Sequence, residues 1–327
     1  MKVSKEKLEN LKKLAGDDGV IAALAIDQRG SMRKMMEGFD KKLNNVEDIS
    51  RFKALVSQKL TKYSSSILLD PIYGLEAAKV RDENAGLLLS YEVTGYDKED
   101  PERLPKLIDS WSGLRIKELG AEAVKILLYY DVDQSDETNN KKKAFIERVG
   151  AECEALGLAY FLEILTYDEN IEDSKSAEFA KIRPKKVIGA IKDFQDERFK
   201  IDVLKVETPV DMNFVEGFGE NPVYSKDEAK KYFKDQSDAS DLPFIFLSGG
   251  VSAKLFKDSL IFAKKAGSKF NGVLCGRATW KGAVEEFAKS DDACEKWLDS
   301  EGLDNIQSLN EVLKDSALSV FEKIEEE

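Results

Sequence analysis

Short apolar runs recur along the chain, and longer stretches of mixed charged and apolar residues separate them. Continuous apolar runs of about four to eight residues are typical of strands that are buried on both faces of a parallel sheet. We predict eight strands, in this order: Val20–Asp27, Ser65–Pro71, Leu87–Glu92, Ala123–Tyr130, Tyr160–Tyr167, Asp202–Pro209, Pro243–Gly250 and Gly272–Arg277.

The stretches between these runs have the periodicity of amphipathic helices. Lys141–Gly157 places apolar residues at helical spacing and ends on a glycine, a common stop signal, and Ser50–Lys62 and Lys254–Ala266 show the same pattern. Eight strands that alternate with helices favour a closed (β/α)8 TIM barrel of the α/β class. The alternative is an open doubly wound sheet, which more often has a Gly-rich turn after its first strand. Here residues 27–29, Asp-Gln-Arg, stand at that place.

One domain over residues 1–327 is the economical interpretation, because no internal repeat or low-complexity linker divides the chain. Barrels of this class commonly exceed about 250 residues as one unit. The charged, amphipathic N-terminus predicts a helix, and a helical extension is expected after about Trp280. The tail Ser316–Glu327 ends in three glutamates, and we expect it to fray.

The composition indicates which cellular compartment and which kinds of binding partner the chain is suited to. The formal net charge of −12 argues against nucleic acid, whose phosphates attract basic surfaces. No run of about 18 apolar residues is present, so we expect no membrane span. The N-terminus lacks the apolar core of a signal peptide. The three cysteines are odd in number and lack metal-ligand spacing, which fits a reducing cytoplasm.

The chain contains no histidine. Catalytic zinc sites usually depend on imidazole ligands, so the sequence excludes a His-ligated metal mechanism. We therefore predict no metal and no cofactor. Acid–base chemistry would fall to carboxylates, lysines or tyrosines.

Four charged side chains interrupt or close the apolar strands: Asp27, Lys125, Glu163 and Lys205. Outward positions of a barrel strand pack against helices, so a charge in mid-strand should point inward. Lys125, Glu163 and Lys205 would then converge inside the barrel from three adjacent strands. A structural ion-pair network is the alternative. Two lysines beside one glutamate favour an uncharged amine instead, and an uncharged amine attacks carbonyl groups.

Further polar groups stand near the same strand ends. Asp27 would serve as a helix cap or, together with Gln28 and Arg29, as a ligand for a polyhydroxylated substrate. Glu92 closes its strand, and we expect it to face the pocket as a further ligand for the substrate.

Two glycine-containing turns predict a phosphate site. The seventh strand runs into Ser248, Gly249 and Gly250, and the eighth runs into Gly276 and Arg277. Turns of this kind leave backbone N–H groups uncovered for an anion, and arginine matches phosphate oxygens. The loops after these two strands are the usual phosphate site of a TIM barrel. The alternative is that they are tight strand-to-helix turns without a ligand.

Six segments carry a family resemblance: LAIDQRG, VKILLYY, FLEILTY, VLKVETP, FLSGGV and CGRATW. Together they resemble the tagatose 1,6-bisphosphate aldolases, a family of lysine-dependent, Schiff-base barrel enzymes. The resemblance runs from about residue 3 to the tail.

The resemblance implies a carbon–carbon lyase that acts on a phosphorylated ketohexose and forms an imine on Lys205. Glu163 would be the acid–base, and Lys125 and Asp27 would support the pair. It assigns one phosphate to Ser248, Gly249, Gly250, Gly276 and Arg277, and we expect Arg29 to bind the second. A homodimer is expected from the resemblance alone. Alternatives are a related aldolase for fructose bisphosphate or a sulfo-sugar phosphate, a non-catalytic sugar-phosphate sensor on the same barrel, and a pyridoxal phosphate enzyme.

Overall fold

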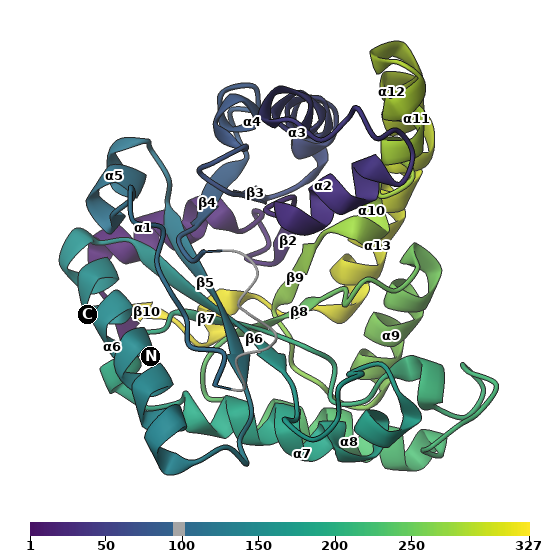
Figure 1. Cartoon of the computed structure of the whole chain (residues 1–327). Helices are drawn as coiled ribbons and strands as arrows, with labels where there is room; N and C mark the ends of the chain where they lie inside the picture. The colour runs from purple at the N-terminus through teal and green to yellow at the C-terminus, as the bar shows by residue number, and fades with distance from the viewer. Residues whose placement is uncertain (94–101) are drawn as a thin grey trace.

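Eight parallel strands close into a barrel in a computed structural model of the chain, which describes residues 1–93 and 102–327 (Figure 1). The strands follow one another around the barrel in sequence order: β2 (Ile21–Ala25), β3 (Ser66–Leu69), β4 (Gly86–Ser90), β5 (Ala123–Tyr130), β6 (Ala159–Thr166), β7 (Val203–Val206), β8 (Phe244–Leu247) and β9 (Gly272–Cys275). The predicted closed barrel is confirmed, and the open sheet is not formed. Most strands end earlier than their apolar runs because the final residues of each run already belong to the loops above the barrel.

Helices lie between the strands and surround the barrel (Figure 1). Those within the strand–helix repeat are α2 (Gly30–Glu37), α3 (Val46–Leu60), α4 (Leu75–Lys79), α5 (Gly113–Glu118), α6 (Asp136–Leu156), α7 (Ala177–Asp193), α8 (Lys226–Asp238) and α9 (Ala253–Lys265). The extension after β9 contains α10 (Arg277–Trp280), α11 (Ala283–Lys289), α12 (Asp291–Trp297), a π-helical turn at Leu298–Gly302 and α13 (Leu303–Ser316). Short 3₁₀ turns occur at Thr61–Tyr63, Glu197–Phe199, Met212–Phe214 and Val320–Glu322. None of the helices in the described ranges is long and apolar enough to cross a bilayer.

Side chains alternate along each strand between the barrel interior and the helix layer. On β5, Ile126 and Leu128 belong to the large apolar cluster between the strands and the helices. Ala123 belongs instead to a second cluster inside the barrel. Lys125 therefore shares the inward parity of Ala123, as the alternation of a strand requires.

The N-terminal helix α1 (Lys5–Leu14) closes the end of the barrel at which the strands begin. We call this end the floor of the barrel. Leu8, Leu11 and Leu14 pack in the interior cluster with residues from all eight barrel strands. The ammonium of Lys7, 1% exposed, donates to Asp202 at 2.9 Å just before β7 and lies 2.8 Å from Glu154. Burial alone would lower the pKa of Lys7, but the two carboxylates outweigh it and raise that pKa.

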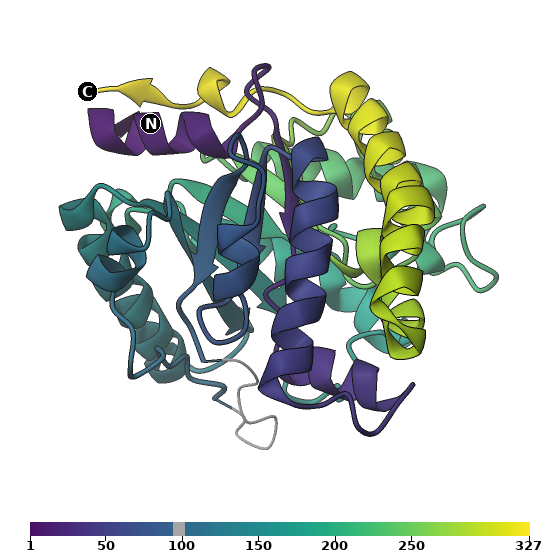
Figure 2. The same cartoon turned by 90° about the horizontal axis from the view of Figure 1, so that it is seen from above.

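The expectation that the tail frays is wrong. The tail ends in β10 (Glu325–Glu326), which pairs in parallel with β1 (Lys2–Val3), and Figure 2 shows this end of the chain beside α1. Val320 and Ile324 are buried in the interior cluster with α1. Burial of these two apolar side chains anchors the tail, and the glutamates remain exposed.

Candidate active site

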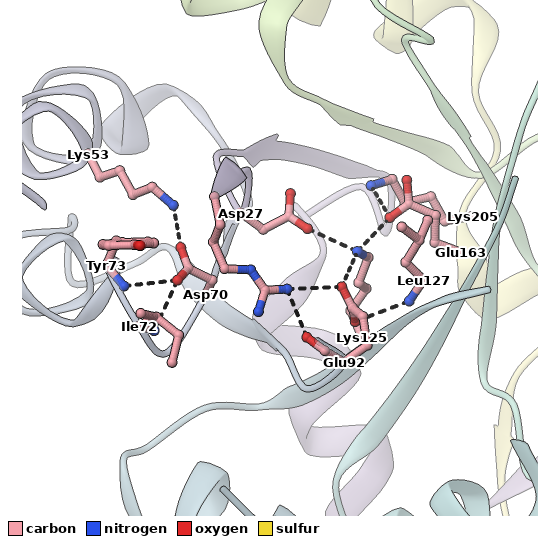
Figure 3. A network of polar contacts seen from close by, with 11 residues as sticks. Asp27, Lys53, Asp70, Ile72, Tyr73, Glu92, Lys125, Leu127, Glu163 and Lys205 are labelled. Carbon is pink, nitrogen blue, oxygen red and sulfur yellow. Dashed lines mark hydrogen bonds and ion pairs between the residues drawn. The ribbon is translucent and has the colours of Figure 1, made fainter. Parts of the chain in front are cut away.

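Three charged side chains from adjacent strands meet inside the barrel (Figure 3). Lys205 of β7 pairs in register with Glu163 of β6, and its ammonium lies 2.9 Å from Glu163 Oε2. The ammonium of Lys125 on β5 lies 2.8 Å from the same oxygen. All three side chains are buried. One carboxylate oxygen therefore bridges two lysines, as the inward parity of the three positions led us to expect.

Lys125 has two further carboxylate partners. Its ammonium lies 2.9 Å from Asp27 Oδ2, just beyond β2, and 3.1 Å from Glu92 Oε1, just beyond β4. From the sequence we expected two lysines beside a single glutamate. In the structure Lys125 contacts three carboxylates. Burial alone would lower the pKa of Lys125, but Asp27, Glu163 and Glu92 together raise it well above its ordinary value. Lys125 is therefore a stable cation at neutral pH.

The three carboxylates differ in their affinity for protons. Burial alone would raise the pKa of Asp27 and of Glu163, but the neighbouring Lys125 and Lys205 outweigh it and lower both. For Glu92 burial prevails over the attraction of Lys125 and Arg29, and its pKa is raised. The neighbouring charges thus favour the ionised forms of Asp27 and Glu163, and burial favours the protonated form of Glu92.

Arg29 lies behind this cluster and contacts Glu92. Its Nη2 donates to the backbone oxygen of Glu92 at 2.8 Å and approaches Glu92 Oε1 at 3.5 Å. Glu92 Oε2 accepts from the backbone N–H of Leu127 at 3.1 Å. Arg29 is 6% exposed. Its assignment to the second phosphate stays a prediction, although its bonds are directed at Glu92.

Gln28 reaches toward the turn after β9. Its Nε2 lies 3.3 Å from the point where a side chain on Gly276 would begin. Its Oε1 is buried and has no hydrogen-bond partner among the described residues. A buried acceptor without a partner is unusual and fits a group that meets a donor on a ligand.

The predicted phosphate turn follows β8. Gly249 and Gly250 have φ values of +59° and +80°, which are strained for any residue with a Cβ. A Cβ on Gly250 would lie 2.9 Å from Arg277 Nη2, so this glycine leaves the space that the guanidinium occupies. A cavity of about 380 Å³ opens beside the turn, and its lining includes Gly250, Ser252 and Arg277. Backbone N–H groups and an arginine that meet at one cavity suit an anionic group.

A buried ion pair between Lys53 of α3 and Asp70 after β3 lies beside the cluster (Figure 3). Asp70 Oδ1 also accepts from the backbone N–H groups of Ile72 and Tyr73, each at 2.9 Å. Burial lowers the pKa of Lys53 despite its carboxylate partner. Sequence reasoning missed this pair, although Asp70 closes its apolar run as Asp27 does.

Asp131, Asp133 and Asp168 lie together beyond β5 and β6, with oxygens within 4.8 Å of one another. They are the group of carboxylates in the described part of the chain whose spacing would suit a metal ion. The ammonium of Lys186 already lies among them, 2.9 Å from Asp133 and 2.7 Å from Asp168, and also contacts Asp131. The position that a cation would take is therefore occupied by a lysine.

The family model of the DeoC/LacD family aldolases matches residues 21–282, from β2 to just before α11. This chain belongs to the DeoC/LacD aldolase family. It is 55% identical over 325 residues to tagatose 1,6-diphosphate aldolase 1 of Enterococcus faecalis, with 99% of each chain covered. It is 53% identical over 326 residues to the tagatose 1,6-diphosphate aldolase of Streptococcus pneumoniae, which covers 99% of this chain and 100% of the relative.

Solved structures share the fold at much lower sequence identity. A Schiff-base-forming fructose 1,6-bisphosphate aldolase superimposes with a TM-score of 0.57 at 16% identity, over 94% of this chain and 99% of the other. An archaeal fructose 1,6-bisphosphate aldolase gives 0.59 at 15% identity with the same coverage. These similarities show that this chain has the same barrel fold as the two aldolases.

Proposed function

We propose that this protein is a Schiff-base aldolase that reversibly cleaves D-tagatose 1,6-bisphosphate to dihydroxyacetone phosphate and D-glyceraldehyde 3-phosphate. The observation that carries the proposal is the buried ammonium of Lys205, 2.9 Å from Glu163 Oε2 inside the barrel. Membership of the DeoC/LacD family and the names of relatives more than 50% identical over nearly the whole chain support the substrate.

Imine formation begins with the transfer of one proton from Lys205 to Glu163. The free amine then attacks the C2 ketone of the open-chain sugar and forms a carbinolamine. Glu163 returns the proton to the carbinolamine hydroxyl, water leaves, and the nitrogen lone pair completes a protonated imine. Glu163 is a carboxylate again at the end of this stage.

Carbon–carbon cleavage uses the protonated imine as the electron acceptor. Glu163 takes the proton of the C4 hydroxyl, the C3–C4 bond breaks, and its electron pair moves into the imine to give an enamine. Glyceraldehyde 3-phosphate leaves. Glu163 then protonates C3 of the enamine, and hydrolysis of the imine releases dihydroxyacetone phosphate and restores Lys205. Proton transfer by a positioned group is typically worth about 10²- to 10⁴-fold in rate.

The remaining site residues have supporting roles. Lys125 holds Glu163 by the oxygen that also contacts Lys205, and so keeps the carboxylate aimed at the reacting atoms. Asp27, held by Lys125, would accept hydrogen bonds from substrate hydroxyls. The turns after β8 and β9 would bind the phosphate of the dihydroxyacetone half through these groups: Ser248, Gly249, Gly250, Gly276 and Arg277.

Epimeric ketohexose bisphosphates are expected as further substrates, as the resemblance to the tagatose 1,6-bisphosphate aldolases implies. The relatives' names favour tagatose bisphosphate over a sulfo-sugar phosphate or a purely sensing role. We further propose a cytoplasmic location, since the three cysteines are free and buried. A homodimer stays a prediction.

Trapping the imine tests the proposal. The protein is incubated with dihydroxyacetone phosphate and borohydride, and the adduct is mapped by mass spectrometry. We expect one adduct on Lys205, none in a Lys205→Arg variant, and an unchanged adduct in a Lys79→Arg control on the exposed surface of α4. A tag on another residue, or no tag, contradicts the assignment. Cleavage should also persist in a strong chelator, and its loss would overturn the metal-independent mechanism.

A further inference from the structure

Residues 106–108 lie along the end of β4, a few residues after Arg103. The backbone N–H of Val93 donates to Lys106 at 2.8 Å, and that of Ile108 donates to Tyr91 at 3.0 Å. Glu92 and Leu107 form an antiparallel bridge. Residues 106–108 are therefore fixed against the strand end that supplies Glu92. Arg103 precedes this anchored segment.

The guanidinium of Arg103 stacks on two tyrosines from the neighbouring strands. It lies 4.1 Å from the ring centroid of Tyr167, just after β6, and 5.4 Å from that of Tyr129 on β5. The Arg103 backbone has a φ of +45°, a left-handed conformation that is uncommon for a residue with a side chain. Such conformations cluster at ligand sites, where the surrounding structure holds them.

The guanidinium of Arg103 makes no hydrogen bond to the part of the chain that the structure describes. Arg103 Nε is buried without a partner, and no ion pair or hydrogen bond joins the side chain to another residue within the described ranges. Lys142 donates to the Tyr167 hydroxyl at 3.0 Å and adds a second positive charge 5.0 Å from the same ring. A stacked arginine with free donors presents a rigid fork that matches the oxygens of a phosphate.

Arg103 lies at the mouth of the barrel, the end at which the strands end. It is across from the glycine-containing turns after β8 and β9. Tyr129 has the inward parity of Lys125 and lies four residues further along β5, about 13 Å toward the mouth at about 3.3 Å per residue. Tyr167 lies four residues beyond Glu163, just after β6. Around the closed barrel, β5 lies four strands from β9, which leads into Arg277, and β7 with Lys205 lies between them. Two arginines thus face the mouth from opposite sides of the reactive lysine.

We propose that Arg103 binds the phosphate at the aldehyde end of the open-chain ketose bisphosphate. This inference rests on the proposed aldolase function, which requires an extended substrate with a phosphate at each end. The turns after β8 and β9 hold one phosphate, and C2 of the sugar reaches Lys205. The other phosphate then extends toward β5 and β6, where Arg103 has free donors. Arg29, by contrast, directs its bonds at Glu92.

An Arg103→Ala variant tests this assignment with two substrates, tagatose 1,6-bisphosphate and tagatose 1-phosphate. We expect kcat/KM for the bisphosphate to fall about 10- to 100-fold, the loss expected for a hydrogen-bonded contact to a charged group. The value for the 1-phosphate should stay within about twofold, because that substrate lacks the phosphate concerned. Arg103→Lys keeps the charge without the fork and should give an intermediate loss.

Two further variants make the test specific. Arg198→Ala removes an exposed arginine that precedes β7 at the opposite end of the barrel, and it should change neither value. Arg29→Ala should lower both values by similar factors, because it disturbs Glu92. If the arginine-to-alanine change at position 103 leaves the preference for the bisphosphate intact, or if the change at position 29 alone abolishes it, the inference is overturned.

Imine trapping separates this inference from the proposed function. Dihydroxyacetone phosphate carries only the first phosphate, so the Arg103→Ala protein should still be tagged on Lys205 to the extent of the unmodified protein. That result also shows that the variant is folded. Absence of tagging in the unmodified protein would instead contradict the aldolase function itself. Loss of tagging in both variants at position 103 would assign Arg103 a structural role and overturn the proposal.

Discussion

Lys125→Met should destabilise the protein in a way that depends on pH. The change removes an ammonium group that contacts Asp27, Glu92 and Glu163 at 2.9, 3.1 and 2.8 Å. Breaking a buried ion pair by deleting one partner typically costs about 3–5 kcal/mol, because a buried charge is left uncompensated. Each kcal/mol shifts Tm by about 2 °C in a chain of this length. We therefore expect Tm to fall by about 6–10 °C at pH 8.

The pH dependence follows from the pKa shifts. The pKa of Lys125 is raised, so its contribution is fully present below the ordinary lysine pKa and is lost only as pH rises through the raised value. The pKa values of Asp27 and Glu163 are lowered, so their contribution is present above the ordinary carboxyl pKa and is lost as pH falls through the lowered values. Neither window lies between pH 5 and 8, so these groups should change the Tm of the unmodified protein little there.

In the variant the carboxylates lose their main cation, and their folded pKa values rise. Glu92, whose pKa is already raised, should take up a proton first. Protonation relieves the buried charge, so the Tm difference from the unmodified protein should shrink as pH falls from 8 to 5. The double variant Lys125→Met/Glu92→Gln should recover part of the loss at pH 8. Thermal melts followed by circular dichroism measure this. An equal Tm loss at every pH would refute the reasoning.

Other changes probe the acid–base group, the phosphate turn and the floor of the barrel. Glu163→Gln should lower kcat by about 10²- to 10⁴-fold with little change in KM, measured by coupled assay of triose phosphate release; a change confined to KM would contradict the acid–base role. Gly250→Ala should raise KM at least several-fold, because the new Cβ would lie 2.9 Å from Arg277 Nη2. Gly120→Ala is its matched control, with a φ of +86° and no atom within 4 Å, so equal effects on KM would contradict the steric argument. Lys7→Met should reduce the free energy of unfolding by about 3–5 kcal/mol in urea denaturation and leave the KM of the folded protein unchanged; a change in KM would show that the floor acts on the site.

The strands and the central lysine–glutamate contact could be predicted from sequence because one rule covers both. A charge within an apolar run must avoid the helix layer, so the positions of Lys125, Glu163 and Lys205 indicated that they point inward. Register then brought them within contact, with Glu163 opposite Lys205. No knowledge of loops was required.

The rest of the site depends on features without periodicity. Arg29 meets Glu92 only because the ends of β2 and β4 lie near each other in the closed barrel, where Leu107 lies antiparallel beside Glu92. Arg103 lies outside the segments that have a periodic apolar pattern, so its position could not be predicted. Its stacking on Tyr167 accompanies a left-handed backbone conformation. The prediction that the tail frays was wrong because it rested on the three exposed glutamates. It overlooked Val320 and Ile324, two apolar residues that are buried in the interior cluster.

The floor of the barrel joins α1, which precedes the first barrel strand, to the tail, which follows the last one. The apolar face of α1 packs against interior residues from every barrel strand, including Leu274 of β9, and against the tail at Val320 and Ile324. During translation this helix leaves the ribosome before the barrel strands and cannot complete its burial until β9 and the tail have emerged. Its leucines therefore remain available to chaperones throughout synthesis. A chain without β9 and the tail would leave part of the apolar face of this helix exposed.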